Sequence, residues 1–380
     1  MSTHRQSGGN VDETPIPGLA TLPAISPAHA EAAATRWDSV AKPPGSLGQL
    51  EAVVNQLAAI QHQSSPRTES VSFYLFAADH GMVNDGVSAW PSMVTGAMLS
   101  TFALGRGAIN RLCERNNVRL QVVDAGVAHR PAAFYYAHAP SKDSAVVCPI
   151  LDLSQGRGTQ SAVRDSAMSL ETAHSALLAG YELIRQQALP TDMVGLGEMG
   201  IGNTASASLI SHALSGHSLD ACIGRGAGLD DEGLARKRDC LEQSIKRAPL
   251  PKAPMEILAR FGGFEIAMMA GAALGAASDG RAVLVDGFIA TAAVALACRM
   301  VPGLRDYCLF CHESTEPGHR LLLDELGARP LLDLSLALGE GSGAAMAVPL
   351  IQNAAACHAE MDTIESVLTR AETDPDTSQA

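Results

Sequence analysis

The 380-residue sequence is poor in aromatic side chains and carries fewer basic than acidic residues. Phe, Trp and Tyr make up 4% of the chain, so an apolar core has to be built mainly from Ala, Leu, Val and Met. Lys and Arg number 27 against 40 Asp and Glu, and the resulting net charge of −13 argues against a surface for nucleic acid. We therefore expect no nucleic-acid partner, although a phosphorylated small molecule needs only a local nest of backbone N–H groups.

No uninterrupted apolar run is long enough to indicate a membrane span. The longest candidate, 282–301, is broken by Asp286 and Gly287, and it divides into a predicted strand at 282–285 and a buried helix at 289–299. The first residues lack both the basic and the apolar stretch of an export signal. The sequence therefore predicts no membrane span and a cytoplasmic location.

The eight cysteines are scattered and lack the dense pattern of a small disulfide-bonded domain. In a chain of this length we expect them to be reduced. Cys308 and Cys311 precede His312 with the spacing of a c-type haem attachment site. The residues between the two cysteines are apolar, which favours the end of a strand over a haem site.

Apolar runs with strand and helix periodicity alternate along the chain, and 35 glycines suit a fold with many tight turns. This alternation predicts an α/β fold in which a doubly wound, mainly parallel, Rossmann-like sheet is flanked by helices. Strands are predicted at 71–77, 119–124, 192–196, 282–285 and 307–311. Helices are predicted at 27–39, 48–61, 92–113, 163–189, 204–214, 230–248, 255–261, 264–277, 289–299, 316–327 and 342–369.

The helical patterns near the two ends of the chain have no strand between them, so they are predicted to pack together as a small helical domain. Both termini are polar and lack apolar periodicity, which is typical of mobile segments. The predicted division is a disordered N-terminal extension at 1–25, a small helical domain from 26–65 and 342–370, a large α/β catalytic domain at 66–341 and a flexible tail at 371–380.

Glu340 stands between Gly339 and Gly341 at the start of an alanine-rich segment that predicts a helix of about four turns. Flanking glycines leave room for a ligand to approach the carboxylate, and the first turn of a helix presents free N–H groups. Glu340 is therefore a candidate general base. The alternative is an acid that only offsets the helix dipole. The dipole would lower its pKa and burial would raise it, and the sequence leaves open which effect prevails.

A second glycine-rich segment, 195–202, follows a predicted strand and precedes a helix of small residues, with Asn203 and Thr204 at the expected N-cap. Such a strand, turn and helix N-terminus can cradle a phosphate. The segment lacks the Gly-Lys-Ser/Thr of a Walker loop, and an ordinary βα turn is the alternative.

A third glycine cluster, 224–228, leads into a helix that carries Arg236 and Lys237. Either cation could neutralise a phosphate, although pairing with an acid on the surface is the commoner arrangement for such residues.

Polar or glycine-rich motifs follow four predicted strands, at 77–81, 196–198, 285–287 and 311–313. In parallel α/β sheets, ligands bind beyond the carboxyl ends of the strands. The four motifs therefore predict a single active site at that edge of the sheet.

Taken together, the motifs resemble one family over residues 27–360. The matching segments are Lys42-Pro43-Pro44-Gly45-Ser46-Leu47-Gly48, Ala78-Asp79-His80-Gly81 with Gly86-Val87-Ser88, 197–204, Gly224-Arg225-Gly226-Ala227-Gly228, His312 with 314–319, and Leu338-Gly339-Glu340-Gly341. The sequence is similar to the nicotinate-nucleotide–dimethylbenzimidazole phosphoribosyltransferase family. Its departures are a longer N-terminal extension and a variable loop around Asn84, Asp85 and Trp90.

The resemblance implies transfer of the 5-phosphoribosyl group of nicotinate mononucleotide to 5,6-dimethylbenzimidazole, a step of cobalamin lower-ligand synthesis. A β-linked donor and an α-linked product imply inversion in a single displacement, which yields α-ribazole 5′-phosphate and nicotinate. Neither a cofactor nor a metal is implied, because departure of the pyridinium neutralises its own charge.

The resemblance also implies roles for individual residues. Glu340 matches the base of the family. The implied phosphate- and ribose-binding residues are Glu198, Gly200, Gly202, Asn203, Lys237 and Asp286. The implied benzimidazole-binding residues are Ser88, Met93 and Leu338.

Two other functions stay open at this point. A non-catalytic benzimidazole or α-riboside binding protein would keep the phosphate turn and an apolar slot, but the presence of Glu340 counts against it. A metallohydrolase using Asp79, His80, His312 and His319 is disfavoured, because no two of them lie one helical turn apart.

The segment 42–48 joins two predicted helices through a stiff Pro-Pro-Gly turn. We interpret this turn as a docking element, and the resemblance implies that the small helical domain lies against a partner subunit. The sequence therefore predicts a homodimer, with a turn that packs on its own chain as the alternative.

Overall fold

The computed structural model describes residues 18–138 and 145–373. Most of the predicted N-terminal extension lies outside the described residues, and 18–26 contain no helix or strand. The predicted flexible tail also lies outside them, except for its first three residues. These belong to the helix α14, Ile364–Thr373.

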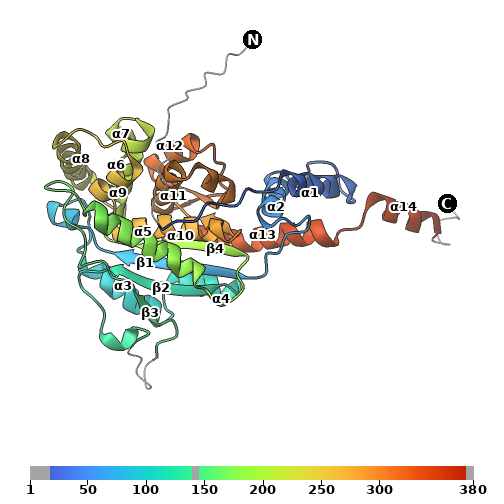
Figure 1. The fold of residues 1–380 in the computed structure, drawn as a ribbon, viewed down its shortest axis with the longest axis horizontal. Helices are drawn as coiled ribbons and strands as arrows, with labels where there is room; N and C mark the ends of the chain where they lie inside the picture. Colours follow the sequence, from blue (N-terminus) through green and yellow to red (C-terminus); the bar gives the residue numbers. More distant parts are fainter. Residues whose placement is uncertain (1–17, 139–144, 374–380) are drawn as a thin grey trace, which may run out of the picture.

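A six-stranded parallel sheet forms the centre of the protein (Figure 1). Its spatial order is β3-β2-β1-β4-β5-β6, so the order reverses between β1 and β4. The strands are β1 (Val71–Ala78), β2 (Arg119–Gly126), β3 (Ile150–Asp152), β4 (Met193–Met199), β5 (Ala282–Val285) and β6 (Cys308–Phe310). In doubly wound folds a reversal of this kind opens a crevice at the carboxyl ends of the strands, where ligands bind.

Helices cover both faces of the sheet. On one face α10 (Phe264–Ser278) packs on the central strands and α5 (Leu170–Arg185) packs on α10. On the other face lie α3 (Met93–Ala103), α4 (Ala108–Arg115) and α13 (Ser342–Glu360). The predicted doubly wound α/β fold is confirmed.

The contact between α5 and α10 is close because glycines line it. A Cβ on Gly271 would stand 1.8 Å from the Leu177 carbonyl oxygen, and one on Gly180 would stand 2.0 Å from the Met268 carbonyl oxygen. These glycines allow backbone to approach backbone in a core that is poor in aromatic residues.

The remaining helices connect these layers. They are α6 (Asn203–Ser215), α7 (Leu219–Cys222), α8 (Asp231–Lys246), α9 (Pro254–Phe261), α11 (Phe288–Met300) and α12 (Pro317–Glu325), together with the short 3₁₀ turns η1 (Gly81–Asp85), η2 (Ala133–Tyr135) and η3 (Pro302–Tyr307).

Several predicted element bounds were wrong. The strand predicted at 307–311 corresponds to β6, and the unpredicted β7 (His312–Ser314) follows it and pairs with the equally unpredicted β8 (Leu332–Leu336) in a separate two-stranded sheet. The short strand β3 was also missed. The helix predicted at 163–189 begins only at Leu170, and the one at 92–113 is divided into α3 and α4.

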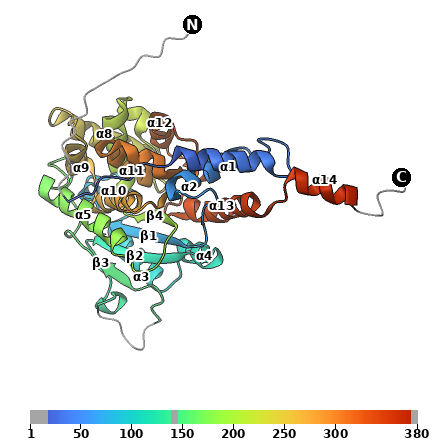
Figure 2. The same cartoon turned by 45° about the vertical axis from the view of Figure 1, so that its right-hand side comes forward.

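The terminal helices lie together on one side of the protein (Figure 2). They are α1 (Pro27–Ser39), α2 (Gln49–Gln61) and α13, and they share a small core of Trp37, Val40, Val54 and Ala354. The opposite side of α2 joins the main core through Val53, Leu57 and Ile60. The division into two domains therefore stays a prediction.

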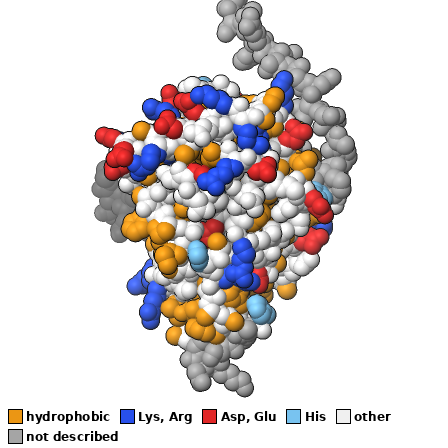
Figure 3. Space-filling view, turned by 90° about the vertical axis from the view of Figure 1, so that its left-hand side faces the viewer, with side chains coloured by type: hydrophobic (Ala, Val, Ile, Leu, Met, Phe, Trp, Pro, Cys, Tyr) orange, Lys and Arg blue, Asp and Glu red, His pale blue; other side chains and the backbone are white. Residues whose placement is uncertain are grey.

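The C-terminal helix predicted at 342–369 is interrupted at 361–363, and its last part, α14, projects beyond the rest of the protein (Figure 2). No residue of α14 is buried. Within the described ranges, no helix is both long and apolar enough to cross a membrane. On the face shown in Figure 3, basic and acidic side chains are interspersed in the upper part.

Candidate active site

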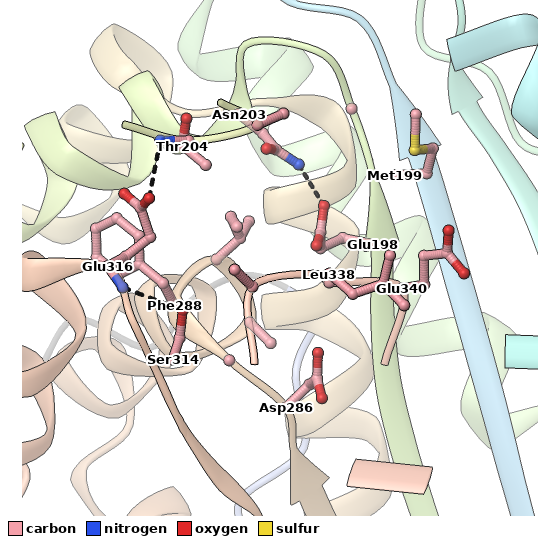
Figure 4. Close-up of a pocket in the computed structure, with 18 of the residues that line it drawn as sticks. Glu198, Met199, Asn203, Thr204, Asp286, Phe288, Ser314, Glu316, Leu338 and Glu340 are labelled. Atoms are coloured by element: carbon pink, nitrogen blue, oxygen red, sulfur yellow. Dashed lines mark hydrogen bonds between the residues drawn. The ribbon is translucent and has the colours of Figure 1, made fainter. Parts of the chain in front are cut away.

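A pocket of about 310 Å³ lies at the carboxyl edge of the main sheet. Its lining comes from the end of β4 and the start of α6, from the turns after β5 and β6, from α3 and the loop before it, and from the segment before α13. In Figure 4, Glu316 and Thr204 lie at one end, Glu340 and Met199 at the other, and Glu198 and Asp286 between them.

The structure brings six of the predicted site residues into this pocket. They are Glu198, Gly200, Asn203, Asp286, Leu338 and Glu340. Four others do not belong to the lining, namely Ser88, Met93, Gly202 and Lys237.

Glu340 has an unusual backbone conformation. Its φ angle is 64°, and it lies between Gly339 at 79° and Gly341 at 85°, so three consecutive residues are left-handed. A non-glycine residue pays a steric penalty in this region, of the order of 1–2 kcal/mol. Strain of this kind is commonly found at functional sites.

The glycines around Glu340 make room for protein groups, and not only for a ligand as expected from the sequence. A Cβ on Gly339 would stand 2.4 Å from Oε1 of Glu198, and one on Gly343 would stand 2.0 Å from Nδ1 of His312. These glycines let the Glu340 segment pack directly against the other polar side chains of the pocket.

The Glu340 carboxylate is buried beside the N-terminus of α4. The Ile109 N–H donates to Oε2 at 3.4 Å, which lowers the pKa, and nearby Asp286 raises it. Desolvation by burial is the largest effect, and the pKa of Glu340 is raised above its ordinary value of 4.5. Burial therefore prevails over the helix N-terminus, in the direction that a general base requires.

Glu198 is the last residue but one of β4, and Nδ2 of Asn203 donates to its Oε2. Burial raises the pKa of Glu198 to about 8, although the Asn203 hydrogen bond opposes this rise, and the negative charges of Asp286, Glu265 and Glu340 add to it. Glu198 is therefore protonated at neutral pH, and its carboxyl group can donate a hydrogen bond to a ligand.

Asp286 follows β5 and supports the segment that carries Glu340. The Ala344 N–H, in the first turn of α13, donates to Oδ1 of Asp286 at 2.8 Å. His312 places its Nδ1 3.3 Å from the same oxygen. Asp286 thus caps α13, and it lines the pocket with its neighbour Gly287.

The N-terminus of α6 and the cluster 224–228 form the opposite end of the pocket. Gly202, with φ 94°, is the N-cap of α6, so the N-cap predicted at Asn203 and Thr204 was wrong by one or two residues. The Cβ position of Gly202 points at Val83 and His80 rather than into the pocket. Left-handed backbone at this point turns the chain from β4 into α6.

Lys237 lies behind this end of the pocket and is completely buried. Its Nζ donates to the Gly224 carbonyl at 2.9 Å and to Oγ1 of Thr204 at 3.1 Å. Burial lowers the pKa of Lys237 to about 8, and the charge of Glu316 partly offsets this effect. Arg236 pairs with Glu232 at the surface, which leaves Lys237 as the cation of the two that is near the site.

Apolar side chains line the pocket from α3, from the loop before it and from the end of β4, namely Trp90, Val94, Met98 and Met199. Met199 lies at the Glu340 end, whereas Nε1 of Trp90 donates to the Ala227 carbonyl at 3.2 Å, beside the cluster 224–228. Met93 is 60% exposed, and Ser88 only accepts a hydrogen bond from the Trp90 N–H. The predicted Leu338 does line the pocket, whereas Ser88 and Met93 belong to the right loop and helix but lie outside the lining, because the side of α3 that faces the pocket depends on how α3 packs on the sheet.

His312, Ser314 and Glu316 were also missed as lining residues. A signal was present, since these residues follow a predicted strand at the edge where the site was expected. The interruption of that strand at Cys311 directs the following residues into the pocket.

The histidines of the metal hypothesis have other partners. His80 bonds Glu265 through Nε2 at 2.6 Å and Ser206 through Nδ1 at 2.9 Å. His319 bonds Thr291, and burial lowers its pKa to about 3. In the part of the chain that the structure describes, no group of three or more His, Cys, Asp and Glu side chains is arranged to hold a metal ion.

The fold and this pocket define a phosphoribosyltransferase, since the family model described as "Phosphoribosyltransferase" matches residues 22–367. Two curated relatives are nicotinate-nucleotide–dimethylbenzimidazole phosphoribosyltransferases. The one from Dechloromonas aromatica is 44% identical over 333 residues, 87% of this chain and 92% of the relative. The one from Cupriavidus necator is 46% identical over 327 residues, covering 86% and 91%.

A crystal structure of the enzyme of the same name from Thermus thermophilus superposes with a TM-score of 0.82 at 38% identity. The match covers 90% of this chain and 98% of the other. The chain belongs to the nicotinate-nucleotide–dimethylbenzimidazole phosphoribosyltransferase family.

Proposed function

We propose that this protein transfers the 5-phosphoribosyl group of nicotinate mononucleotide to 5,6-dimethylbenzimidazole with inversion, giving α-ribazole 5′-phosphate and nicotinate for the lower ligand of cobalamin. The main support is the pocket itself. It joins a carboxylate of raised pKa beside the apolar Met199 and Leu338 to the N-terminus of α6 at its other end, and a helix N-terminus favours an anion.

The proposed arrangement of the substrates follows from the different chemistry of the two ends of the pocket. The 5′-phosphate lies at the N-terminus of α6, near the Gly226 N–H and in front of Lys237. The benzimidazole lies against Met199 and Leu338, within reach of Glu340. The ribose then spans the middle, beside Glu198 and Asp286.

The proposed reaction is one displacement at the anomeric carbon. Glu340 accepts the proton from one ring nitrogen while the other nitrogen forms the new bond to C1′. The bond from C1′ to the pyridinium nitrogen breaks, and its electron pair stays on that nitrogen, so nicotinate leaves with a neutral ring. Protonated Glu198 supplies a hydrogen-bond donor in the water-poor centre of the pocket.

The alternative is a non-catalytic benzimidazole or α-riboside binding protein. It would require an apolar slot and a phosphate cradle, but no buried carboxylate in a strained backbone. The left-handed conformation of Glu340 and its raised pKa favour catalysis.

The decisive experiment incubates the purified protein with nicotinate mononucleotide and a panel of benzimidazoles, purines and phenols. We expect stoichiometric release of nicotinate with dimethylbenzimidazole, and a product whose mass and anomeric configuration identify it as the α-riboside phosphate. Binding of both substrates without release of nicotinate would instead establish the binding protein.

The pH dependence of the reaction should show two limbs. Glu340 has to lose its proton to act as the base, so kcat should rise with pH through a pKa above 4.5. Glu198 ionises near pH 8, which removes a donor and adds a second negative charge, so kcat should fall above that value.

The measurement is kcat and KM from about pH 5 to about pH 9.5. Glu198→Gln, which keeps a donor without a charge, should lose the alkaline limb and keep the acid limb. Lys237 also has a pKa of about 8 in the empty pocket, but its deprotonation should raise KM for the mononucleotide rather than lower kcat. An alkaline limb in kcat that persists in Glu198→Gln would contradict the assignment.

We also propose a homodimer and a cytoplasmic location. All eight cysteines are free, which suits a reducing compartment. The segment 42–48 supports the dimer less than expected, because Lys42 is held within its own chain by Glu51 at 2.7 Å and by the Trp37 ring. The projecting helix α14 offers better support, since Ile364, Val367 and Leu368 form one exposed apolar face.

Placing charges on that face should weaken the dimer. We expect the Ile364→Glu, Leu368→Glu double variant to sediment as a monomer at micromolar concentration, because two carboxylates would have to be desolvated in the interface. Thr369→Glu, on the far side of the same helix, is the control and should leave the association unchanged. If the wild-type protein is already a fully active monomer, the homodimer proposal is wrong.

A further inference from the structure

Glu316 occupies the phosphate end of the pocket. It is the N-cap residue of α12, and its Oε1 accepts a hydrogen bond from the Gly226 N–H at 2.8 Å (Figure 4). A Cβ on Gly224 would stand 2.1 Å from Oε2 of the same carboxylate. The third glycine cluster, 224–228, therefore forms a small binding site, or seat, for a carboxylate.

This seat carries the features of an anion site. Lys237 donates to the Gly224 carbonyl and to Thr204 directly behind it. Lys237 forms no ion pair within 4.0 Å in the described part of the chain, yet the charge of Glu316 acts on it. Burial lowers the pKa of Lys237, and a nearby anion favours its charged form.

The carboxylate does not fill the seat well. Its Oε2 is buried and has no hydrogen-bond partner. A buried oxygen of an ionised group without a donor is costly, so the seat is not built for Glu316 alone. A phosphate has three terminal oxygens and a tetrahedral shape, and it could use donors that a planar carboxylate leaves unused.

We propose that Glu316 is a stand-in for the substrate phosphate: it occupies the Gly226 N–H in the empty enzyme and is displaced when the 5′-phosphate binds. The inference rests on the proposed function for the identity of the ligand, but not for the presence of an anion site. Two anions cannot share one N–H beside one ammonium group without strong repulsion, so the carboxylate has to leave its position.

Two consequences follow for the enzyme. In the absence of substrate, Glu316 supplies the negative charge that a buried Lys237 needs. When substrate binds, only a ligand that carries an anion at this position can replace the carboxylate. Glu316 therefore competes with the phosphate and weakens binding of the mononucleotide, whereas it leaves binding of the corresponding riboside, which lacks the phosphate, unaffected.

The test is Glu316→Gln, which keeps the size and the acceptor for Gly226 but removes the competing charge. Calorimetric titrations should use inorganic phosphate, nicotinate mononucleotide and nicotinate riboside as separate ligands. We expect the Kd of the variant for inorganic phosphate and for the mononucleotide to fall by about tenfold or more, with the Kd for the riboside unchanged.

Glu313→Gln is the matched control, because Glu313 lies on the same segment but pairs with Arg320 at 3.0 Å away from the pocket. It should leave all three affinities unchanged. Unchanged or weaker phosphate binding by Glu316→Gln would overturn the inference, as would an equal loss for mononucleotide and riboside, which would place Glu316 on the ribose. Failure of the wild-type protein to release nicotinate would instead reject the proposed function.

Discussion

Replacing Glu340 by Gln should lower kcat by about 10²–10⁴, the range for loss of a general base, while the protein stays folded and binds both substrates. The amide can still accept the Ile109 N–H bond that holds the carboxylate. The variant therefore removes the proton acceptor and changes little else in the pocket.

The measurement is steady-state kcat and KM for each substrate, with binding of the mononucleotide determined independently. Glu182→Gln, on the exposed side of α5, is an acid-to-amide control and should behave as the wild-type protein. Near-normal turnover in Glu340→Gln would remove Glu340 from the role of base and would leave its strained backbone without a catalytic explanation.

The second large effect is expected at Gly202. A valine there would have to adopt a φ near 94°, and its Cβ would stand 2.8 Å from Val83 and 3.2 Å from Cβ of His80. Both conflicts displace the N-cap of α6. We expect Gly202→Val to raise KM for nicotinate mononucleotide by tenfold or more, with a smaller change for dimethylbenzimidazole, and to lower stability by about 2–3 kcal/mol.

Gly216 provides a matched control at the other end of the same helix. It also has a left-handed conformation, with φ 70°, but nothing lies within 4 Å of its Cβ position. Gly216→Val should therefore lower the melting temperature without changing KM. If Gly202→Val lost stability but bound the mononucleotide normally, the phosphate would have to lie elsewhere in the pocket.

The sequence located much of this site for a physical reason. In a parallel sheet the carboxyl ends of the strands meet at one edge, so residues that follow β4 and β5 converge wherever the helices pack. The segments with Glu198 and Asp286 were found in this way, and the family resemblance implied binding roles for them and for Asn203. Gly339 and Gly341 marked Glu340 because only a glycine-rich segment readily adopts consecutive left-handed conformations.

Other parts of the site could not be deduced from local sequence. Trp90 and Met98 line the pocket because the loop before α3 and one side of that helix face it. Glu316 reaches Gly226 across 90 residues of chain, and no spacing rule connects them. Gly343 is required by His312, which belongs to a different element.

The sequence by itself therefore determined the α/β class, the parallel sheet and the edge at which the site lies, because hydrophobic periodicity and glycine turns act over a few neighbouring residues. Only the tertiary structure decided the raised pKa values of Glu198 and Glu340 and the burial of Lys237 behind the pocket. The pKa of a side chain depends on how much water its neighbours exclude and which charges they bring near, and those neighbours are distant in the chain.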